Sequence, residues 1–171
     1  MIKSENSATD RFSPLVILLI TYFLCRLLFQ QFTIMKVGFI FPTGIIVEIF
    51  YGTGEFINKE WLFGIEQTRF VLGESCSGTT FFSLLFAYIL YRIKTQNIPY
   101  FWLFLIYPVA IIANAMRVLS SIYAHNTLSA FNVSKFSNEA HVITGAIAFL
   151  CVFLIIAYIV ENPNNEKLNE Y

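Results

Sequence analysis

Three side chains with the chemistry of an acyl-transfer site stand in or beside apolar runs of this sequence: Cys76, Arg117 and His141. A thiol, a guanidinium and an imidazole can serve as nucleophile, oxyanion stabiliser and base. Cys76 lies where the small and polar residues of GESCSGTT give way to an apolar run, so we expect it to open a helix. The positive end of a helix favours the thiolate form, which is the nucleophile.

Three further residues support this set. Gly78 allows backbone or substrate to approach the cysteine closely. Asn114 precedes Arg117 by three residues, which places both on one face of a helix. Glu74 lies two residues before the cysteine and is a possible partner for a cation.

The other cysteines and the second histidine are weaker candidates. Cys25 and Cys151 lie inside apolar runs and are expected to be small buried hydrophobes. The three cysteines have unrelated spacings, so we expect neither a disulfide framework nor a metal site, and no cofactor. His125 is a rival base, but we expect it in a loop with nothing to fix its depth, so we prefer His141.

The composition indicates which elements must position these groups. Apolar types make up 57% of the 171 residues and charged types 13%, about half of the roughly 25% typical of soluble domains. So little charge cannot cover a soluble globule, so we infer an integral membrane protein. Eleven basic side chains balance eleven acidic ones, which leaves no electropositive face for nucleic acid.

The expected fold is a single all-α membrane domain over 1–171, a bundle of about four transmembrane helices of about 20 residues each. The stretch 41–52 is short and contains Pro42, Gly44 and Glu48, which indicates an interfacial helix. The segment 60–73 predicts a short extracytoplasmic β-hairpin. The remaining predicted parts are a cytoplasmic tail at 1–13, transmembrane helices at 14–33, 76–92, 98–123 and 139–160, an extracytoplasmic segment at 36–75, and a cytoplasmic tail at 161–171.

Orientation follows from the shortest predicted loop, 91–97. It carries Arg92 and Lys94 and no acid, so the positive-inside rule places it in the cytoplasm. Both termini then lie inside, and the segments 36–75 and 124–138 lie outside.

The same loop sets the depth of the candidate site. Counted from Thr95, Cys76 and Arg117 lie about 29 Å and about 33 Å along two antiparallel helices. The two side chains should therefore meet near the outer membrane face. His141 opens the last predicted helix on that same face.

These residues resemble the exosortase/archaeosortase family of membrane-embedded cysteine transpeptidases. The matching motifs are Cys-x-Gly at Cys76 to Gly78, Asn-x-x-Arg at Asn114 to Arg117, and His141 with a glycine four residues later. Each motif alone is weak, but the three in this order are quite specific. The resemblance covers about 60–160, and the chain resembles a short subtype of the exosortase K kind.

The resemblance implies a multi-pass protease or transpeptidase of a prokaryotic cytoplasmic membrane, with its active site facing outward. Its partners would be membrane lipid and secreted proteins whose carboxy-terminal sorting signal contains a transmembrane helix. Cys76 would attack the scissile carbonyl, and Arg117 would stabilise the thiolate or the oxyanion. His141 would protonate the leaving amine and activate the incoming nucleophile. No metal or organic cofactor is implied.

Two other functions remain open at this stage. A membrane thiol acyltransferase or thioesterase would use the same three groups on a different substrate. A non-catalytic membrane assembly subunit would use Arg117 only as the ion-pair partner of Glu74 or Glu139.

Overall fold

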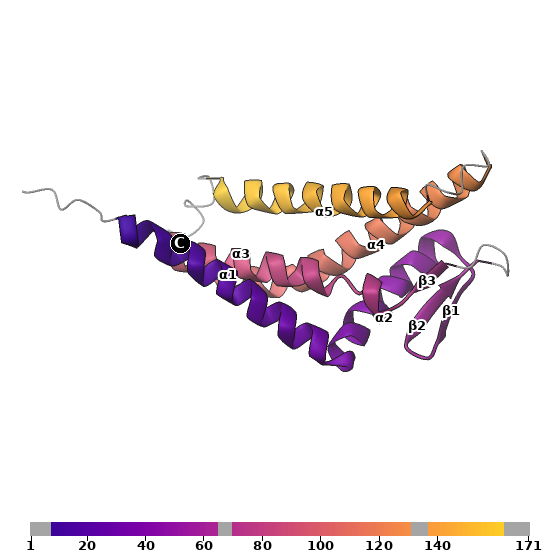
Figure 1. Cartoon of the computed structure of the whole chain (residues 1–171), viewed down its shortest axis with the longest axis horizontal. Helices are drawn as coiled ribbons and strands as arrows, with labels where there is room; N and C mark the ends of the chain where they lie inside the picture. The colour runs from indigo at the N-terminus through magenta and orange to yellow at the C-terminus, as the bar shows by residue number, and fades with distance from the viewer. Residues whose placement is uncertain (1–7, 65–69, 131–136, 163–171) are drawn as a thin grey trace, which may run out of the picture.

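The computed structural model describes residues 8–64, 70–130 and 137–162. Most of them are helical, as the sequence predicts, and a small sheet lies at one end (Figure 1). In chain order the elements are α1 (Ala8–Gln31), α2 (Thr33–Tyr51), β1 (Gly54–Ile57), β2 (Glu60–Phe63), β3 (Phe70–Leu72), the 3-10 helix η1 (Glu74–Cys76), α3 (Thr79–Gln96), α4 (Trp102–Ala130) and α5 (Ser137–Glu161).

The helices α1, α3, α4 and α5 run roughly along the long axis of the molecule (Figure 1). The sheet lies at the end where α2 and α4 finish and α5 begins. α4 packs on α5, α1 packs on α3, and α2 packs on α4 and on the sheet. This arrangement brings the start of α3, the second half of α4 and the start of α5 to one end of the bundle.

Three helices of the described chain are long and apolar enough to cross a membrane: Thr33–Tyr51, Trp102–Thr127 and Val142–Glu161. Only 6% of the last of these is buried within the molecule. Such an exposed apolar surface indicates a membrane protein. α1 adds only a shorter apolar stretch, Leu15–Phe29, and α3 does not reach this standard, so the expected set of four spans is not confirmed.

The expected interfacial helix at 41–52 is not confirmed either, because residues 41–51 are part of the 19-residue helix α2 and Gly52 caps it. Pro42 lies inside that helix. A proline lacks an N–H, so the carbonyl of Gly38, four residues earlier, loses its helical donor. The Tyr107 hydroxyl of α4 donates to that carbonyl at 2.7 Å instead. Tertiary packing therefore repairs the break that the sequence indicated.

The sheet contains the predicted hairpin and one strand more. β2 and β3 pair antiparallel within the predicted segment, and β1 adds to the other edge of β2. Asn58 and Lys59 join β1 to β2 with φ of 53° and 72°, and positive φ at both central residues is typical of a tight type I′ hairpin turn. Trp61 and Phe63 are buried against α2, where Gly44 leaves room for the indole.

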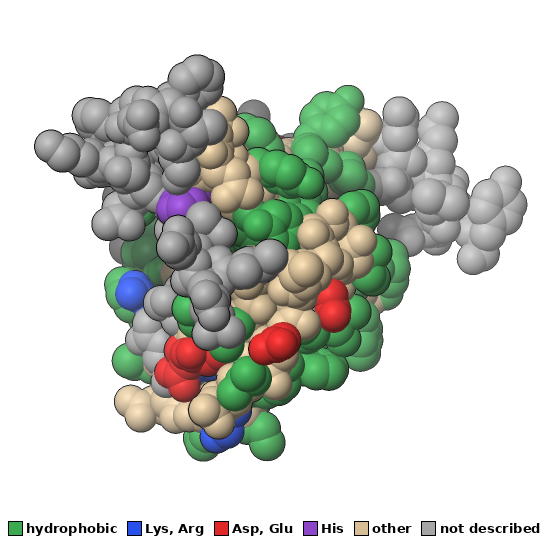
Figure 2. Space-filling model, turned by 90° about the vertical axis from the view of Figure 1, so that its right-hand side faces the viewer, with side chains coloured by type: hydrophobic (Ala, Val, Ile, Leu, Met, Phe, Trp, Pro, Cys, Tyr) green, Lys and Arg blue, Asp and Glu red, His purple; other side chains and the backbone are tan. Residues whose placement is uncertain are grey.

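The end that carries the sheet is the polar end of the molecule. Figure 2 views this end, where acidic side chains lie near one another, with a few basic side chains and many hydrophobic ones around them. Exposed acids here include Glu48 in α2, Glu55 in β1 and Glu74 in η1. Charged side chains are expensive to place in hydrocarbon, and these acids distinguish this end from the apolar surfaces of the helices.

Arg92 and Lys94 belong to α3 and not to a loop, which corrects the expected boundary. Arg92 is buried, and its Nη1 lies 3.2 Å from Oε1 of Glu161 at the end of α5. The Tyr88 hydroxyl donates to the same carboxylate oxygen at 3.0 Å. Arg92 therefore ties α3 to α5, and Lys94 is the exposed one of the two cations on which the orientation depends.

Candidate functional site

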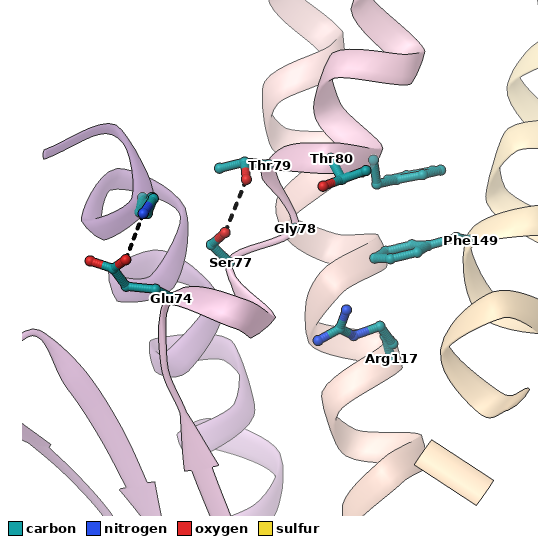
Figure 3. A pocket seen from close by; sticks show the side chains of 9 residues that line it. Glu74, Ser77, Gly78, Thr79, Thr80, Arg117 and Phe149 are labelled. Carbon is teal, nitrogen blue, oxygen red and sulfur yellow. Dashed lines mark hydrogen bonds and ion pairs between the residues drawn. The ribbon is translucent and has the colours of Figure 1, made fainter. Parts of the chain in front are cut away.

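A cavity of about 390 Å³ lies beside the start of α3, between α2, α4 and α5 (Figure 3). Its wall contains two cations, one carboxylate, three hydroxyl groups and two aromatic rings. The lining residues are Lys36, Glu74, Ser77, Gly78, Thr79, Thr80, Phe81, Arg117 and Phe149.

Cys76 lies at the edge of this cavity and not in its wall. It is the last residue of η1, and two residues, Ser77 and Gly78, separate it from α3, which corrects the expectation that it opens the helix itself. Its side chain is 9% exposed and belongs to an apolar cluster with Trp61 and Leu72 of the sheet and Val118 of α4. The cavity wall begins again at the next residue, Ser77.

Gly78 separates the cysteine turn from α3. Its φ of +76° lies in the left-handed region, which favours glycine, and it is the N-cap of α3. A Cβ at this position would lie 2.8 Å from Cγ of Asn114. The glycine of the Cys-x-Gly motif therefore supplies both the turn and the space for the asparagine of the second motif.

Asn114 connects α4 to the backbone of the cysteine. It is completely buried, and its Nδ2 donates to the Cys76 carbonyl at 2.9 Å. The same nitrogen lies 3.4 Å from the Thr43 hydroxyl of α2. Because Arg117 follows Asn114 by about one helical turn, this bond agrees with the predicted common depth of Cys76 and Arg117.

The guanidinium of Arg117 lies below Phe149 in Figure 3 and points toward the side of the cavity that carries Ser77. Its Cζ lies 5.4 Å from the centre of the Phe149 ring, a cation–π contact. A Cβ at Gly145 would lie 3.1 Å from Cδ of Arg117, so the glycine of the third motif makes room for the arginine stem. Phe81 of α3 stacks on the same Phe149 ring, with ring centres 4.3 Å apart. The contacts with Gly145 and Phe149 hold the arginine side chain against α5, and Phe81 of α3 packs on the Phe149 ring.

The guanidinium has unused donors. Its Nε and Nη2 are buried, and neither donates a hydrogen bond within the described part of the chain. A buried charged group without partners carries a large desolvation penalty. Such a group facing a cavity is typical of a site that binds an anionic or carbonyl group.

Glu74 does not pair with Arg117. Its Oε2 lies 2.5 Å from Nζ of Lys36 in α2, at the rim of the cavity (Figure 3). The Lys36 side chain is 17% exposed and that of Glu74 is 49% exposed. The assembly-subunit alternative named two ion-pair partners for Arg117. The first of these pairs, Arg117 with Glu74, is not formed. The side chain of Glu139, the other partner it named, lies outside the described residues.

The helix starts contribute further donors. The first backbone N–H groups of an α-helix have no acceptor within the helix, and Thr79, Thr80 and Phe81 at the start of α3 all line the cavity. The Ser77 and Thr79 hydroxyls lie 3.1 Å apart. The cavity wall is therefore rich in donors on the α3 side as well as on the α4 side.

Both histidines lie in helices, so their positions differ less than the sequence indicated. His125 lies in α4, which continues to Ala130, and so it is not in a loop. It follows Arg117 by about 12 Å of helix. His141 lies in the first turns of α5, about 6 Å before Gly145. Its side chain lies outside the described residues.

Sequence reasoning did not find the contribution of α2. Lys36 and Thr43 reach η1 and Asn114 from that helix, and both are polar residues in an otherwise apolar stretch. Polar groups in apolar helices are the signal that could have found them. Phe149 carried no signal, because it is one of 19 phenylalanines in the chain.

The described residues contain no group of three or more His, Cys, Asp or Glu side chains that could hold a metal ion. The chain matches no protein-family model, no curated protein and no solved structure.

Proposed function

We propose that the chain is a membrane-embedded cysteine protease or transpeptidase of the exosortase/archaeosortase type. Its substrates are secreted proteins, which it cleaves at a carboxy-terminal sorting signal on the outer face of a prokaryotic cytoplasmic membrane. The observation that carries the proposal is the Arg117 guanidinium, whose buried Nε and Nη2 have no partner in the described chain and which faces a cavity next to Cys76.

The contacts among the three motifs support the proposal. Gly78 packs on Asn114, Asn114 holds the Cys76 carbonyl, and Gly145 packs on Arg117. Five of the six residues that the resemblance singled out therefore touch a residue of another motif, and the side chain of the sixth, His141, lies outside the described residues. Unrelated polar residues in apolar helices would have no reason to interlock in this way.

The proposed reaction uses these groups in order. The Cys76 thiolate attacks the scissile carbonyl, and the negative charge that develops on its oxygen is held by Arg117 and by the first N–H groups of α3. The tetrahedral intermediate collapses to a thioester, and His141 gives a proton to the leaving amine. Water or an acceptor amine, activated by the same imidazole, then attacks the thioester carbonyl. The C–S bond breaks, the acyl product leaves, and the Cys76 thiolate is regenerated.

The reaction requires the Cys76 side chain to turn from the apolar cluster toward the cavity. Catalytic contacts are often loose in a free enzyme and tighten in the substrate complex. The next residue, Ser77, already lines the cavity. The movement that we propose is therefore a rotation of the Cys76 side chain about its Cα–Cβ bond.

The test is a comparison of wild type, Cys76→Ala and Cys76→Ser in cells that produce a tagged secreted protein with a carboxy-terminal transmembrane signal. We expect the wild type to shorten the substrate and both variants to leave it intact. A thioester adduct, trapped by hydroxylamine and identified by mass spectrometry, would separate peptide cleavage from the acyltransferase or thioesterase alternative. Full processing by Cys76→Ala would end the proposal.

A further inference from the structure

The turn that carries Cys76 is held from α2 at both of its ends. At the start of η1, Glu74 pairs with Lys36. At its end, the Cys76 carbonyl accepts a hydrogen bond from Asn114, which in turn contacts Thr43. Lys36 and Thr43 are about two helical turns apart and therefore lie on one face of α2.

Thr43 supplies the second acceptor for the Asn114 amide that holds the Cys76 carbonyl. Thr43 and Asn114 are both completely buried. The two N–H groups of an asparagine amide can serve two acceptors, and here these are the Thr43 hydroxyl and the Cys76 carbonyl. The Asn114 Oδ1 is buried and has no partner within the described chain. If the amide rotated by half a turn, Oδ1 would face the Cys76 carbonyl oxygen and repel it.

Lys36 acts on the other end of the turn through charge. Its ammonium group is mostly enclosed, whereas the Glu74 carboxylate is about half exposed. A partly buried ion pair is screened less by salt than one in open water. The pair therefore restrains the backbone of η1 at the rim of the cavity.

We infer that Thr43 and Lys36 are positioning residues for Cys76, so that α2 forms part of the active site. This inference rests on the proposed function, because it concerns the same nucleophile. It extends the site to a helix that lies before the stretch carrying the motif resemblance. Neither residue takes part in bond making; each fixes one end of the turn that presents the thiol.

The first experiment removes the Thr43 hydroxyl. Thr43→Val keeps the shape of the side chain and loses the acceptor, while Thr43→Ser keeps the acceptor. In a background of Cys25→Ala and Cys151→Ala, the alkylation rate of Cys76 by N-ethylmaleimide in native membranes reports the position of the thiol without need of a substrate. We expect Thr43→Val to be alkylated several-fold faster, with kcat lower by about tenfold and KM unchanged, since misplacement reduces the rate of chemistry.

The controls separate positioning from stability. Thr43→Ser should match the wild type in both measurements. Phe39→Leu, a buried change on α2 in the other apolar cluster, should lower thermal stability without changing the alkylation rate. Wild-type alkylation and kcat in Thr43→Val would overturn the role of Thr43.

The second experiment exchanges the charges of Lys36 and Glu74 at the rim of the cavity. Glu74 is exposed, so its substitution does not disturb the apolar core. Lys36→Glu and Glu74→Lys each create a like-charge pair, and we expect each to lower kcat by roughly tenfold. The double variant restores the attraction and should return to within about threefold of wild type. A double variant as poor as the singles, with a raised KM, would mean that Lys36 binds an anionic group of the substrate and would overturn its positioning role.

The two proposals fail in different ways. Full processing by Cys76→Ala removes the proposed function but leaves the alkylation measurement valid. Unchanged alkylation of Cys76 in Thr43→Val removes the positioning role even if the chain processes its substrate.

Discussion

Gly145 of α5 lies directly against the stem of Arg117 of α4, where a Cβ would be 3.1 Å from Cδ and 3.2 Å from Cγ of the arginine. This contact is tighter than most side-chain contacts to a Cβ, so α5 could not approach α4 so closely with any larger residue. The guanidinium lies over Phe149 of the same helix. The position of Arg117 in the cavity therefore depends on a residue that has no chemistry of its own.

We predict that enlarging Gly145 lowers processing in proportion to size. Gly145→Ala requires Arg117 to move by a few tenths of an ångström and should cost a few-fold in kcat, whereas Gly145→Leu should cost about 10²-fold, because misplacement on the order of 1 Å has that effect. The measurement is the fraction of a tagged substrate that is cleaved, normalised to the amount of enzyme.

Gly38→Ala is the matched control. Gly38 also lies in an apolar helix, but a Cβ there would meet nothing within 4 Å. Alanine is better than glycine inside a helix by about 0.5–1 kcal/mol, so this variant should be as active as wild type. Equal activity in Gly145→Leu and Gly38→Ala would show that the α4–α5 contact does not determine the site.

The second prediction concerns the donor geometry of Arg117. Arg117→Lys keeps the positive charge but loses the planar fork of donors. Loss of one oxyanion donor typically lowers kcat by about 10²- to 10³-fold, and we expect a loss in that range with little change in KM.

Arg92→Lys serves as the control for changes at a buried arginine. Arg92 is also buried, but its partners are Tyr88, Gln96 and Glu161 at the opposite end of α3. A lysine there can keep the ion pair with Glu161, so processing should stay within a few-fold of wild type. If both lysine variants lost activity equally, the effect would come from helix packing and not from the cavity.

Local sequence patterns predict that the chain is mostly helical and that the three motifs lie together. They do not predict that α2 is one continuous helix. Pro42, Gly44 and Glu48 indicated a broken helix on local rules. Tyr107 supplies the donor that Gly38 lacks, and the indole of Trp61 occupies the space beside Gly44. Those partners are distant in sequence, so no local pattern could indicate them.

The same reasoning explains the error at His125. The sequence predicts a loop from residue 124, yet Thr127 donates to the Tyr123 carbonyl four residues earlier and remains in α4, as Ser120 and Ser121 do in the predicted helix before it. Hydroxyls that satisfy themselves within the helix do not end it. The depth of Cys76 relative to Arg117 was accessible from the sequence, because it depends only on helix rise and on one loop.

The third prediction is the orientation of the membrane domain. Asn58 occupies the exposed β1–β2 turn, and Thr95 is exposed in the last turn of α3 at the other end. In a background without native cysteines, an impermeant maleimide applied to sealed cells should label Asn58→Cys and not Thr95→Cys. Labelling of Thr95→Cys alone would place the candidate site on the cytoplasmic side and remove secreted proteins as substrates.

The fourth prediction assigns the base. The Ser121 and Thr144 hydroxyls lie 3.4 Å apart across α4 and α5. In that antiparallel pair, His141 lies about one turn beyond Gly145 toward the polar end, whereas His125 lies about two turns beyond Arg117. His141 is therefore the closer of the two to the level of the guanidinium. We expect His141→Ala to be as severe as Cys76→Ser, because residues that act as a unit lose activity non-additively.

His125→Ala should stay within a few-fold of wild type, and His141→Gln should be no better than His141→Ala, since an amide cannot exchange the proton. Cleavage by each variant is measured in membranes at several pH values. His125→Ala should keep the pH dependence of the wild type, whereas His141→Ala should give no cleavage at any of these pH values. Because the two histidines lie at the same end of α4 and α5, both variants are needed. Loss in His125→Ala with full activity in His141→Ala would transfer the role of the base to α4, where the imidazole would approach the cavity along the same helix as Arg117.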